Sequence, residues 1–298
     1  MNDLKDRIAI VTGASQGIGL ATAERIASEG ATVIVGARTL GDMDNPEPKT
    51  LADAVARIRG RGGKAHAIQL DMNKPESRAA FMDEVLGKFG KVDVLVNNAA
   101  FGAIAQQRLW EMEDKRFRKA FEINVFGPRD MMLRALPSMM AQNWGRIVNV
   151  SSTVADRAAP NIEGPPFQDF HRSSGISAYC SSKSALNLMT RALAAELHGT
   201  GISANTVAPV NSVITENVQE QIDSGVIGIE RFTAPEDPEV MAEAILALCL
   251  VDPQVSTGLT TYSGQFLQSI GREVRGRDGG EFSGKITTES VRYAAPAD

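Results

Sequence analysis

The first forty residues constrain the fold most, because they predict a strand, a glycine-rich turn, a helix and a second strand in immediate succession. Residues 7–12 (RIAIVT) are a short β-branched run typical of a buried parallel strand. The segment Gly13–Gly19 contains three glycines, and an apolar helical pattern then runs to Gly30. A second strand is predicted at 31–35. Such a unit closes with a right-handed crossover and begins a parallel sheet.

The alternation of strands and helices continues along the chain. Further strands are predicted at residues 66–70, 92–96, 145–150, 203–207 and 259–262. Helices are predicted at residues 51–58, 76–89, 112–140 (interrupted near Asn124 and Pro128), 179–197 (with its apolar stripe from residue 185) and 238–251. We therefore expect an α/β fold, a Rossmann-type doubly wound parallel sheet of about seven strands with helices on both faces.

Domain organisation follows from the same pattern. Residues 1–264 are interpreted as one dinucleotide-binding and catalytic domain. Residues 265–298 are polar and glycine-rich, and we interpret them as a C-terminal extension that is either disordered or wrapped around a neighbouring subunit.

Composition excludes several classes of protein. The net charge is −5 without a basic stripe, which argues against a nucleic-acid partner. The apolar run at 245–251 is too short to span a bilayer, and the charged N-terminus does not resemble a signal peptide. The two cysteines, Cys180 and Cys249, have no metal-binding spacing and are expected to be buried and reduced. These features predict a cytoplasmic protein without a metal site or membrane partner.

The glycine-rich turn is a candidate nucleotide site. Its spacing is Gly-x-x-x-Gly-x-Gly, and it leads from a strand into a helix. Bare backbone N–H groups and a helix N-terminus at that place suit a pyrophosphate, although an ordinary tight turn is the alternative. The predicted contacts are Gly13, Ser15, Gln16, Gly17, Ile18 and Gly19.

The end of the second strand favours NADP over NAD. A binder of NAD usually carries an acidic residue there for the ribose hydroxyls, whereas this chain has Ala37 followed by Arg38. A guanidinium suits the 2′-phosphate of NADP. A solvated residue at a strand end is the alternative interpretation of Arg38, and NAD is the alternative cofactor. Asp71, which ends the third strand, can accept from an adenine amino group or cap a turn.

A tyrosine and a lysine stand four positions apart on a predicted helix. Tyr179 and Lys183 therefore share one helix face. An ammonium at roughly 4 Å would stabilise a phenolate by about 4 kcal/mol, which is about three pKa units. That would make Tyr179 useful for proton transfer near neutral pH. A pair on a solvated helix face is the alternative interpretation.

Taken together, these motifs resemble the single-domain branch of the short-chain dehydrogenase/reductase family. The resemblance extends from residue 7 to about residue 262. The matching residues are Thr12, Gly13, Gly17, Gly19, Asp71, Asn97, Asn98, Ala99, Asn124, Ser152, Tyr179, Lys183 and the segment Pro209–Thr215. Val210 stands where the family usually has glycine, and Ala100 replaces another glycine.

The resemblance implies hydride transfer between NADP(H) and a carbonyl or alcohol. Tyr179 would be the general acid or base, with Lys183 lowering its pKa and holding the nicotinamide ribose. Ser152 would bind the reacting oxygen and Asn124 would carry a water. Ser152 is assigned from the end of the fifth strand, because its interval to Tyr179 is longer than usual. The implied cofactor contacts also include Met72, Asn98, Ala99, Tyr179, Lys183, Pro209, Val213 and Thr215.

Two irregular segments are expected to shape the substrate pocket. These are the segment 153–175, interpreted as a loop at the rim, and the segment 208–228, interpreted as a lid. Their apolar residues favour a small, fairly hydrophobic substrate: Val154, Pro160, Phe167, Phe170, Val226 and Ile227. A non-catalytic NADP(H)-binding redox sensor is the competing hypothesis. The resemblance further implies a homodimer or homotetramer that associates through the helices holding Asn124 and Tyr179.

Overall fold

A seven-stranded parallel sheet forms the centre of the molecule. The computed structural model describes residues 3–102, 107–155, 175–226, 228 and 234–289. The strand order is β3-β2-β1-β4-β5-β6-β7, and all pairs are parallel. The strands are β1 (Ile8–Thr12), β2 (Thr32–Ala37), β3 (Lys64–Gln69), β4 (Val94–Asn97), β5 (Gly145–Val150), β6 (Ile202–Ala208) and β7 (Thr260–Tyr262). The predicted Rossmann-type sheet is confirmed.

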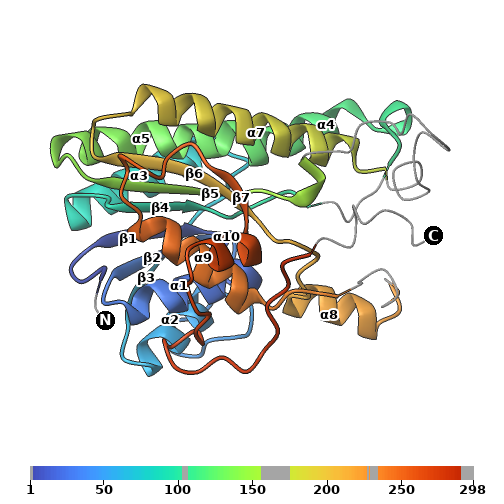
Figure 1. Ribbon diagram of the computed structural model, residues 1–298. Helices are drawn as coiled ribbons and strands as arrows, with labels where there is room; N and C mark the ends of the chain where they lie inside the picture. Colours follow the sequence, from blue (N-terminus) through green and yellow to red (C-terminus); the bar gives the residue numbers. More distant parts are fainter. Residues whose placement is uncertain (1–2, 103–106, 156–174, 227, 229–233, 290–298) are drawn as a thin grey trace.

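Helices cover both faces of this sheet (Figure 1). One face carries α1 (Gly17–Ser28), α2 (Leu51–Gly60), α9 (Pro238–Leu250) and α10 (Ser263–Ser269). The other carries α3 (Pro75–Phe89), α5 (Gly127–Ala141) and α7 (Ser177–Glu196), with α4 (Asp114–Phe121) beside α7. None of the described helices combines the length and the apolar character that crossing a membrane would require.

The strands divide their side chains between two cores because alternate residues point to opposite faces of a sheet. In β1, Ala9 and Val11 pack in the cluster formed with α1, α2, α9 and α10. Ile8 and Ile10 pack instead with α3, α5 and α7. Every residue of β1 is buried, as expected for a central strand covered on both sides.

The long helical region predicted at 112–140 consists of three pieces. The helix α4 ends at Phe121, a π-helical turn (η2) spans Glu122–Phe126, and α5 begins at Gly127 with Pro128 in its first turn. The predicted interruption near Asn124 and Pro128 is therefore present. A π-helical turn widens the helix by one residue and commonly marks a functional site.

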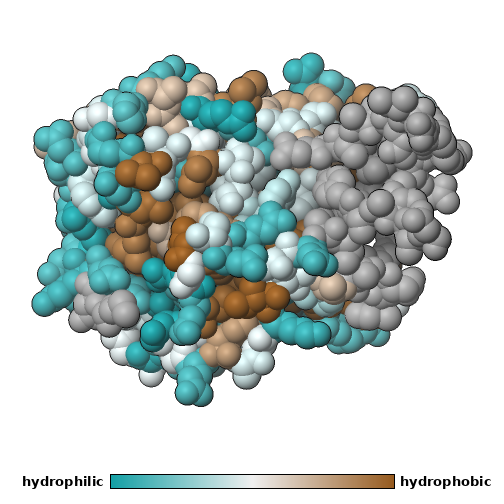
Figure 2. Space-filling model, in the orientation of Figure 1, coloured by the Kyte–Doolittle hydropathy of each residue, from teal (hydrophilic) through white to brown (hydrophobic). Residues whose placement is uncertain are grey.

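The C-terminal extension packs on its own chain as far as it is described. Arg272 donates to Glu243 of α9 at 2.6 Å. Arg277 donates to Glu239 of α9 at 2.6 Å and lies 3.4 Å from Glu24 of α1. In the view of Figure 2, apolar side chains gather near α9 and α10 among a mostly hydrophilic periphery. The extension is thus attached to α1 and α9 by ion pairs.

Candidate active site

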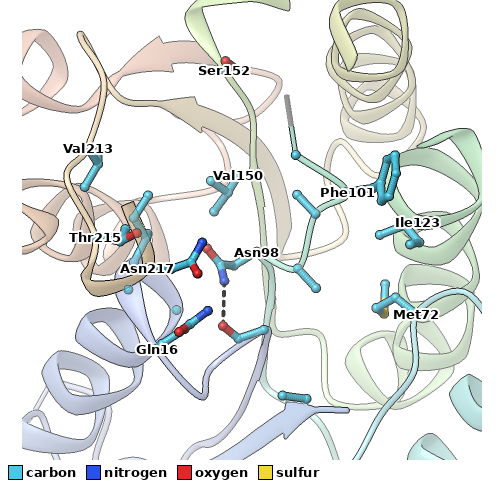
Figure 3. A pocket seen from close by; sticks show the side chains of 18 of the residues that line it. Gln16, Met72, Asn98, Phe101, Ile123, Val150, Ser152, Val213, Thr215 and Asn217 are labelled. Carbon is cyan, nitrogen blue, oxygen red and sulfur yellow. Dashed lines mark hydrogen bonds between the residues drawn. The ribbon is translucent and has the colours of Figure 1, made fainter. Parts of the chain in front are cut away.

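A cleft of about 1010 Å³ opens at the carboxyl edge of the sheet. It lies where β1 and β4 are neighbours although β2 follows β1 in the chain, which is the switch point at which such sheets bind ligands. It is lined by Ser152, Tyr179, Lys183 and every residue predicted above to contact the cofactor. Asn124 is not among its lining residues. Residues far apart in the sequence are therefore brought together, as Figure 3 shows for ten of them.

The glycine-rich turn is shaped by close backbone contacts. Gly13 and Gly17 have φ values of +67° and +57°, in the left-handed region that favours glycine. A Cβ at Gly19 would lie 2.3 Å from the carbonyl oxygen of Gly13. The Asn98 amide donates to the carbonyls of Thr12 and Gly13 at 2.9 and 3.2 Å and so ties the turn to β4 (Figure 3).

The N-terminus of α1 has the features of an anion site. Its first turn contains no acidic residue, and its N-cap residue Gln16 makes no side-chain capping bond. The Gln16 Oε1 atom is buried and has no hydrogen-bond partner among the described residues. The backbone N–H of Gly17 donates to a carboxylate oxygen of Glu216 at 3.0 Å. This turn therefore already holds an anion, which is the chemistry that a pyrophosphate requires.

The end of β2 provides the positive charge expected for a phosphate. Arg38 is exposed and lines the cleft, and Lys49 lines it too. Lys49 was not among the site residues predicted from the sequence. The nearby Asp71 carboxylate accepts from the backbone N–H of Asn73 at 3.0 Å, so it caps a turn and lines the cleft as well.

Lys183 is buried beside the ring of Tyr179. Its side-chain nitrogen lies 5.9 Å from the centre of that ring and donates to the Val150 carbonyl at 2.6 Å. Burial lowers the pKa of Lys183 to about 8. Most of this ammonium is still charged at pH 7, so it can stabilise a phenolate next to it.

The two serines after β5 have different surroundings. The hydroxyl of Ser151 is buried and donates to Asn187 of α7 at 2.6 Å. Ser152 is partly exposed in the cleft, and its hydroxyl is 3.5 Å from the backbone N–H of Val154. The Ser151 hydroxyl is thus engaged inside the protein, which leaves Ser152 as the hydroxyl nearer to a ligand.

Asn124 lies behind the cleft in the π-helical turn and is fully buried. Its Oδ1 accepts from the Phe101 backbone N–H at 2.8 Å, and its Nδ2 donates to the Phe101 carbonyl and to Ser182. Its amide therefore fixes Phe101, a cleft residue, and the start of α7. The predicted loop at 153–175 falls mainly on residues 156–174, which lie outside the described part of the chain.

Comparison with known proteins decides the family. A family model described as short chain dehydrogenase matches residues 7–165 and 167–224. The chain belongs to the short-chain dehydrogenase family. An oxidoreductase of Mycobacterium bovis is 33% identical over 208 residues, which are 70% of this chain and 55% of that protein. The chain thus spans about half the length of that relative.

Two reductases match most of this chain. The 3-oxoacyl-[acyl-carrier-protein] reductase of Thermotoga maritima is 31% identical over 260 residues, covering 86% of this chain and 95% of that protein. The crystal structure of a 3-oxoacyl (acyl-carrier-protein) reductase from Agrobacterium tumefaciens with NADP bound has a TM-score of 0.70. It is 26% identical and covers 87% of this chain and 93% of that one.

In this short-chain dehydrogenase a buried carboxylate holds the loop after β6. Glu236 is 1% exposed; it accepts from the Val210 backbone N–H at 3.0 Å and from the Ser263 hydroxyl at 2.5 Å. The loop continues through Asn211, Ser212 and Val213, which line the cleft. Burial raises the pKa of Glu236 to about 7. Sequence reasoning missed this residue, because its partners are distant in the chain.

Glu236→Gln is expected to change how the stability of this short-chain dehydrogenase depends on pH. The pKa rises from 4.5 to about 7 on folding, so between these values the folded chain keeps a proton that the unfolded chain loses. Wild-type stability should therefore fall across this range, by up to about 3 kcal/mol. Urea unfolding from pH 5 to pH 8 should show this fall in the wild type and a flatter profile in the variant. Exposed Asp83→Asn is the control, and parallel profiles for Glu236→Gln and wild type would contradict the assignment.

Proposed function

We propose that the chain is an NADP-dependent oxidoreductase that interconverts the carbonyl and alcohol of a small, fairly hydrophobic substrate. The observation that carries this proposal is that Tyr179 and the buried ammonium of Lys183 line the same cleft as the glycine-rich turn. A proton donor and an anion-binding turn in one cleft are what hydride transfer to a carbonyl requires.

The residues of the cleft fit an NADP molecule. The backbone N–H of Gly17 would donate to its pyrophosphate, and the unpartnered Gln16 oxygen would accept from a ribose hydroxyl. Arg38 and Lys49 would meet its 2′-phosphate. When bound, the dinucleotide supplies or accepts the hydride. Relatives in the family crystallised with NADP support this choice, and NAD is the alternative.

In the proposed reaction Tyr179 donates its phenolic proton to the substrate oxygen during reduction and takes a proton from the alcohol during oxidation. The charge of Lys183 favours the phenolate form of Tyr179. The Ser152 hydroxyl donates a hydrogen bond to the same substrate oxygen as negative charge develops on it. Asn124 acts indirectly: it does not line the cleft, and it positions Phe101 and Ser182 by hydrogen bonds.

The substrate is inferred from the apolar side chains of the cleft. Val154 and Ile176 line it and pack with Tyr179. Val226, in the segment 208–228, lines it too. Two of these, Val154 and Val226, belong to the apolar set noted in the sequence. Such a wall favours a substrate with hydrocarbon next to its carbonyl or alcohol group. A redox sensor without catalysis would not need the Tyr179–Lys183 pair.

A panel of carbonyls and alcohols, followed by the absorbance of the reduced nicotinamide, tests the proposed function. We expect turnover of at least one fairly hydrophobic member, with a higher kcat/KM for NADP(H) than for NAD(H). Tight binding of NADP(H) without oxidation or reduction across the whole panel would favour the sensor hypothesis instead.

We also propose that the chain associates through α5 and α7. Phe126, Leu133 and Met140 recur every seventh residue along one side of the α5 region and are 51%, 47% and 42% exposed. Leu188 on α7 is 67% exposed. Apolar side chains so exposed mark an interaction surface. Sedimentation at micromolar concentration should give a dimer or tetramer, and Leu188→Glu should shift it toward monomer; a wild-type protein found only as monomer would contradict this.

A further inference from the structure

The helix α8 (Glu216–Asp223) lies against the cleft, in the segment that the sequence analysis interpreted as a lid. Thr215, Asn217 and Val218 all line the cleft. In Figure 3, Asn217 points toward Asn98 and Gln16 of the nucleotide-binding side. Because two of the three carboxylates of α8, Glu216 and Glu220, contact residues that line the cleft, its position has electrostatic consequences for any anion that enters.

The first of these carboxylates sits on the glycine-rich turn. Glu216 accepts from the Gly17 backbone N–H at 3.0 Å, at the first residue of α1. Its other oxygen lies 3.8 Å from a guanidinium nitrogen of Arg277 in the C-terminal extension. A carboxylate therefore holds the place that the cofactor's pyrophosphate would take, and the extension helps to keep it there.

The second carboxylate pairs with a cation at the other end of the cleft. Glu220 forms an ion pair with Lys49, which lines the cleft together with Arg38 and Thr39. The Leu51 N–H donates to the Thr39 carbonyl at 3.0 Å, so the start of α2, two residues after Lys49, is held beside the end of β2. Lys49 itself has φ +64°, a left-handed conformation that few non-glycine residues adopt.

We propose that α8 is an internal competitor of the dinucleotide: Glu216 holds the pyrophosphate place on Gly17, and Glu220 holds Lys49, a second cation for the 2′-phosphate. This inference rests on the proposed function. A phosphate and a carboxylate cannot accept from the same N–H or neutralise the same ammonium at full strength. Cofactor binding therefore has to release both contacts of α8, and Lys49 contributes to the choice of NADP.

The two contacts predict different cofactor dependences. The pyrophosphate is common to NADP and NAD, so Glu216→Gln should tighten the binding of both. Only NADP carries the 2′-phosphate, so Glu220→Gln should tighten NADP and leave NAD nearly unchanged. Lys49→Met should weaken NADP by about tenfold and NAD by less than about twofold. Each Gln variant should lower the Kd by about twofold to fivefold, the range for partly exposed charge contacts.

Calorimetric titration of the full chain with NADP and with NAD measures these constants without substrate. Asp223→Asn is the matched control, because it removes the same charge from an exposed position on α8 that does not line the cleft. Combining Lys49→Met with Glu220→Gln should abolish the gain from Glu220→Gln, because the freed cation is then missing.

Two results would overturn the inference. One is Kd values for Glu216→Gln and Glu220→Gln that match Asp223→Asn with both dinucleotides. The other is an equal gain for NAD and NADP in Glu220→Gln, which would indicate a general charge effect. Both leave the proposed function intact if wild type binds NADP. If neither wild type nor any variant binds either dinucleotide, the proposed function fails, and the inference fails with it.

Discussion

Replacing Tyr179 with phenylalanine is expected to lower kcat by about 10²–10⁴-fold, the usual contribution of a general acid or base. The change removes one hydroxyl and keeps the ring, which packs against Val154, Ile176 and Cys180. Binding of NADP, measured by calorimetry, should therefore stay close to the wild-type value. Turnover should be measured with any substrate that the panel identifies.

The matched control is Tyr262→Phe, which makes the same chemical change at the start of α10, outside the cleft. It should retain wild-type kcat. Undiminished turnover in Tyr179→Phe would contradict the assigned role. Loss of NADP binding in that variant would show that the hydroxyl holds the cofactor, and the fall in kcat could then not be assigned to proton transfer.

Glu243→Ala is expected to lower the free energy of unfolding by about 3–5 kcal/mol. Glu243 is fully buried and accepts from Arg25 of α1 at 2.7 Å and from Arg272 of the extension at 2.6 Å. The Arg25 side chain is only 1% exposed. Removing the carboxylate leaves the buried Arg25 guanidinium with Glu29, at 2.7 Å, as its one described ion-pair partner, and a half-compensated charge is costly to keep out of water. Urea unfolding at pH 7 measures the change.

Glu239→Ala is the control on the same helix. Its side chain is 20% exposed and accepts from Arg277 at 2.6 Å, so its loss should cost about 1 kcal/mol or less. Glu243→Gln, which keeps an acceptor for Arg25, should fall between the two. A cost below about 1 kcal/mol for Glu243→Ala would contradict this account, because it would mean that Glu29 alone is enough to compensate the buried charge of Arg25.

The sheet was predictable because its determinants are local. Short β-branched runs that are buried throughout, such as β1, and glycines at positions with positive φ, such as Gly13 and Gly17, act within a few residues of the chain. The predicted strand at 145–150 agrees with β5 from Gly145 to Val150. The clustering of polar residues at one sheet edge then follows from parallel topology alone.

Helix α8 and the course of the extension could not be predicted in the same way. None of the eight residues of α8 is buried, so the segment lacks the buried apolar stripe from which a helix is usually predicted. What holds them is Gly17, Lys49 and Arg277, all distant in sequence. Likewise Arg272 and Arg277 look like solvated charges until the structure pairs them with Glu243 and Glu239. Such long-range ion pairs leave no periodic signal.

The sequence predicted which residues form the candidate site better than it predicted their burial and hydrogen bonds. Spacing indicated that Tyr179 and Lys183 share a face, but two features of Lys183 come from tertiary packing: the burial that lowers its pKa and its hydrogen bond to the Val150 carbonyl of β5. Spacing also could not separate Ser151 from Ser152, which differ in their contact with Asn187 on α7. For Asn124 the family resemblance implied a water carrier, and only the fold revealed its bonds to Phe101.

A crystal structure of the full chain soaked with NADP tests most directly whether the cleft binds the dinucleotide with its nicotinamide beside Tyr179. We predict the 2′-phosphate beside Arg38 and Lys49, the pyrophosphate on the glycine-rich turn, and the nicotinamide next to the phenol of Tyr179, with α8 moved away from Gly17. A dinucleotide bound elsewhere, or one whose nicotinamide lies at the opposite end from that phenol, would contradict the account.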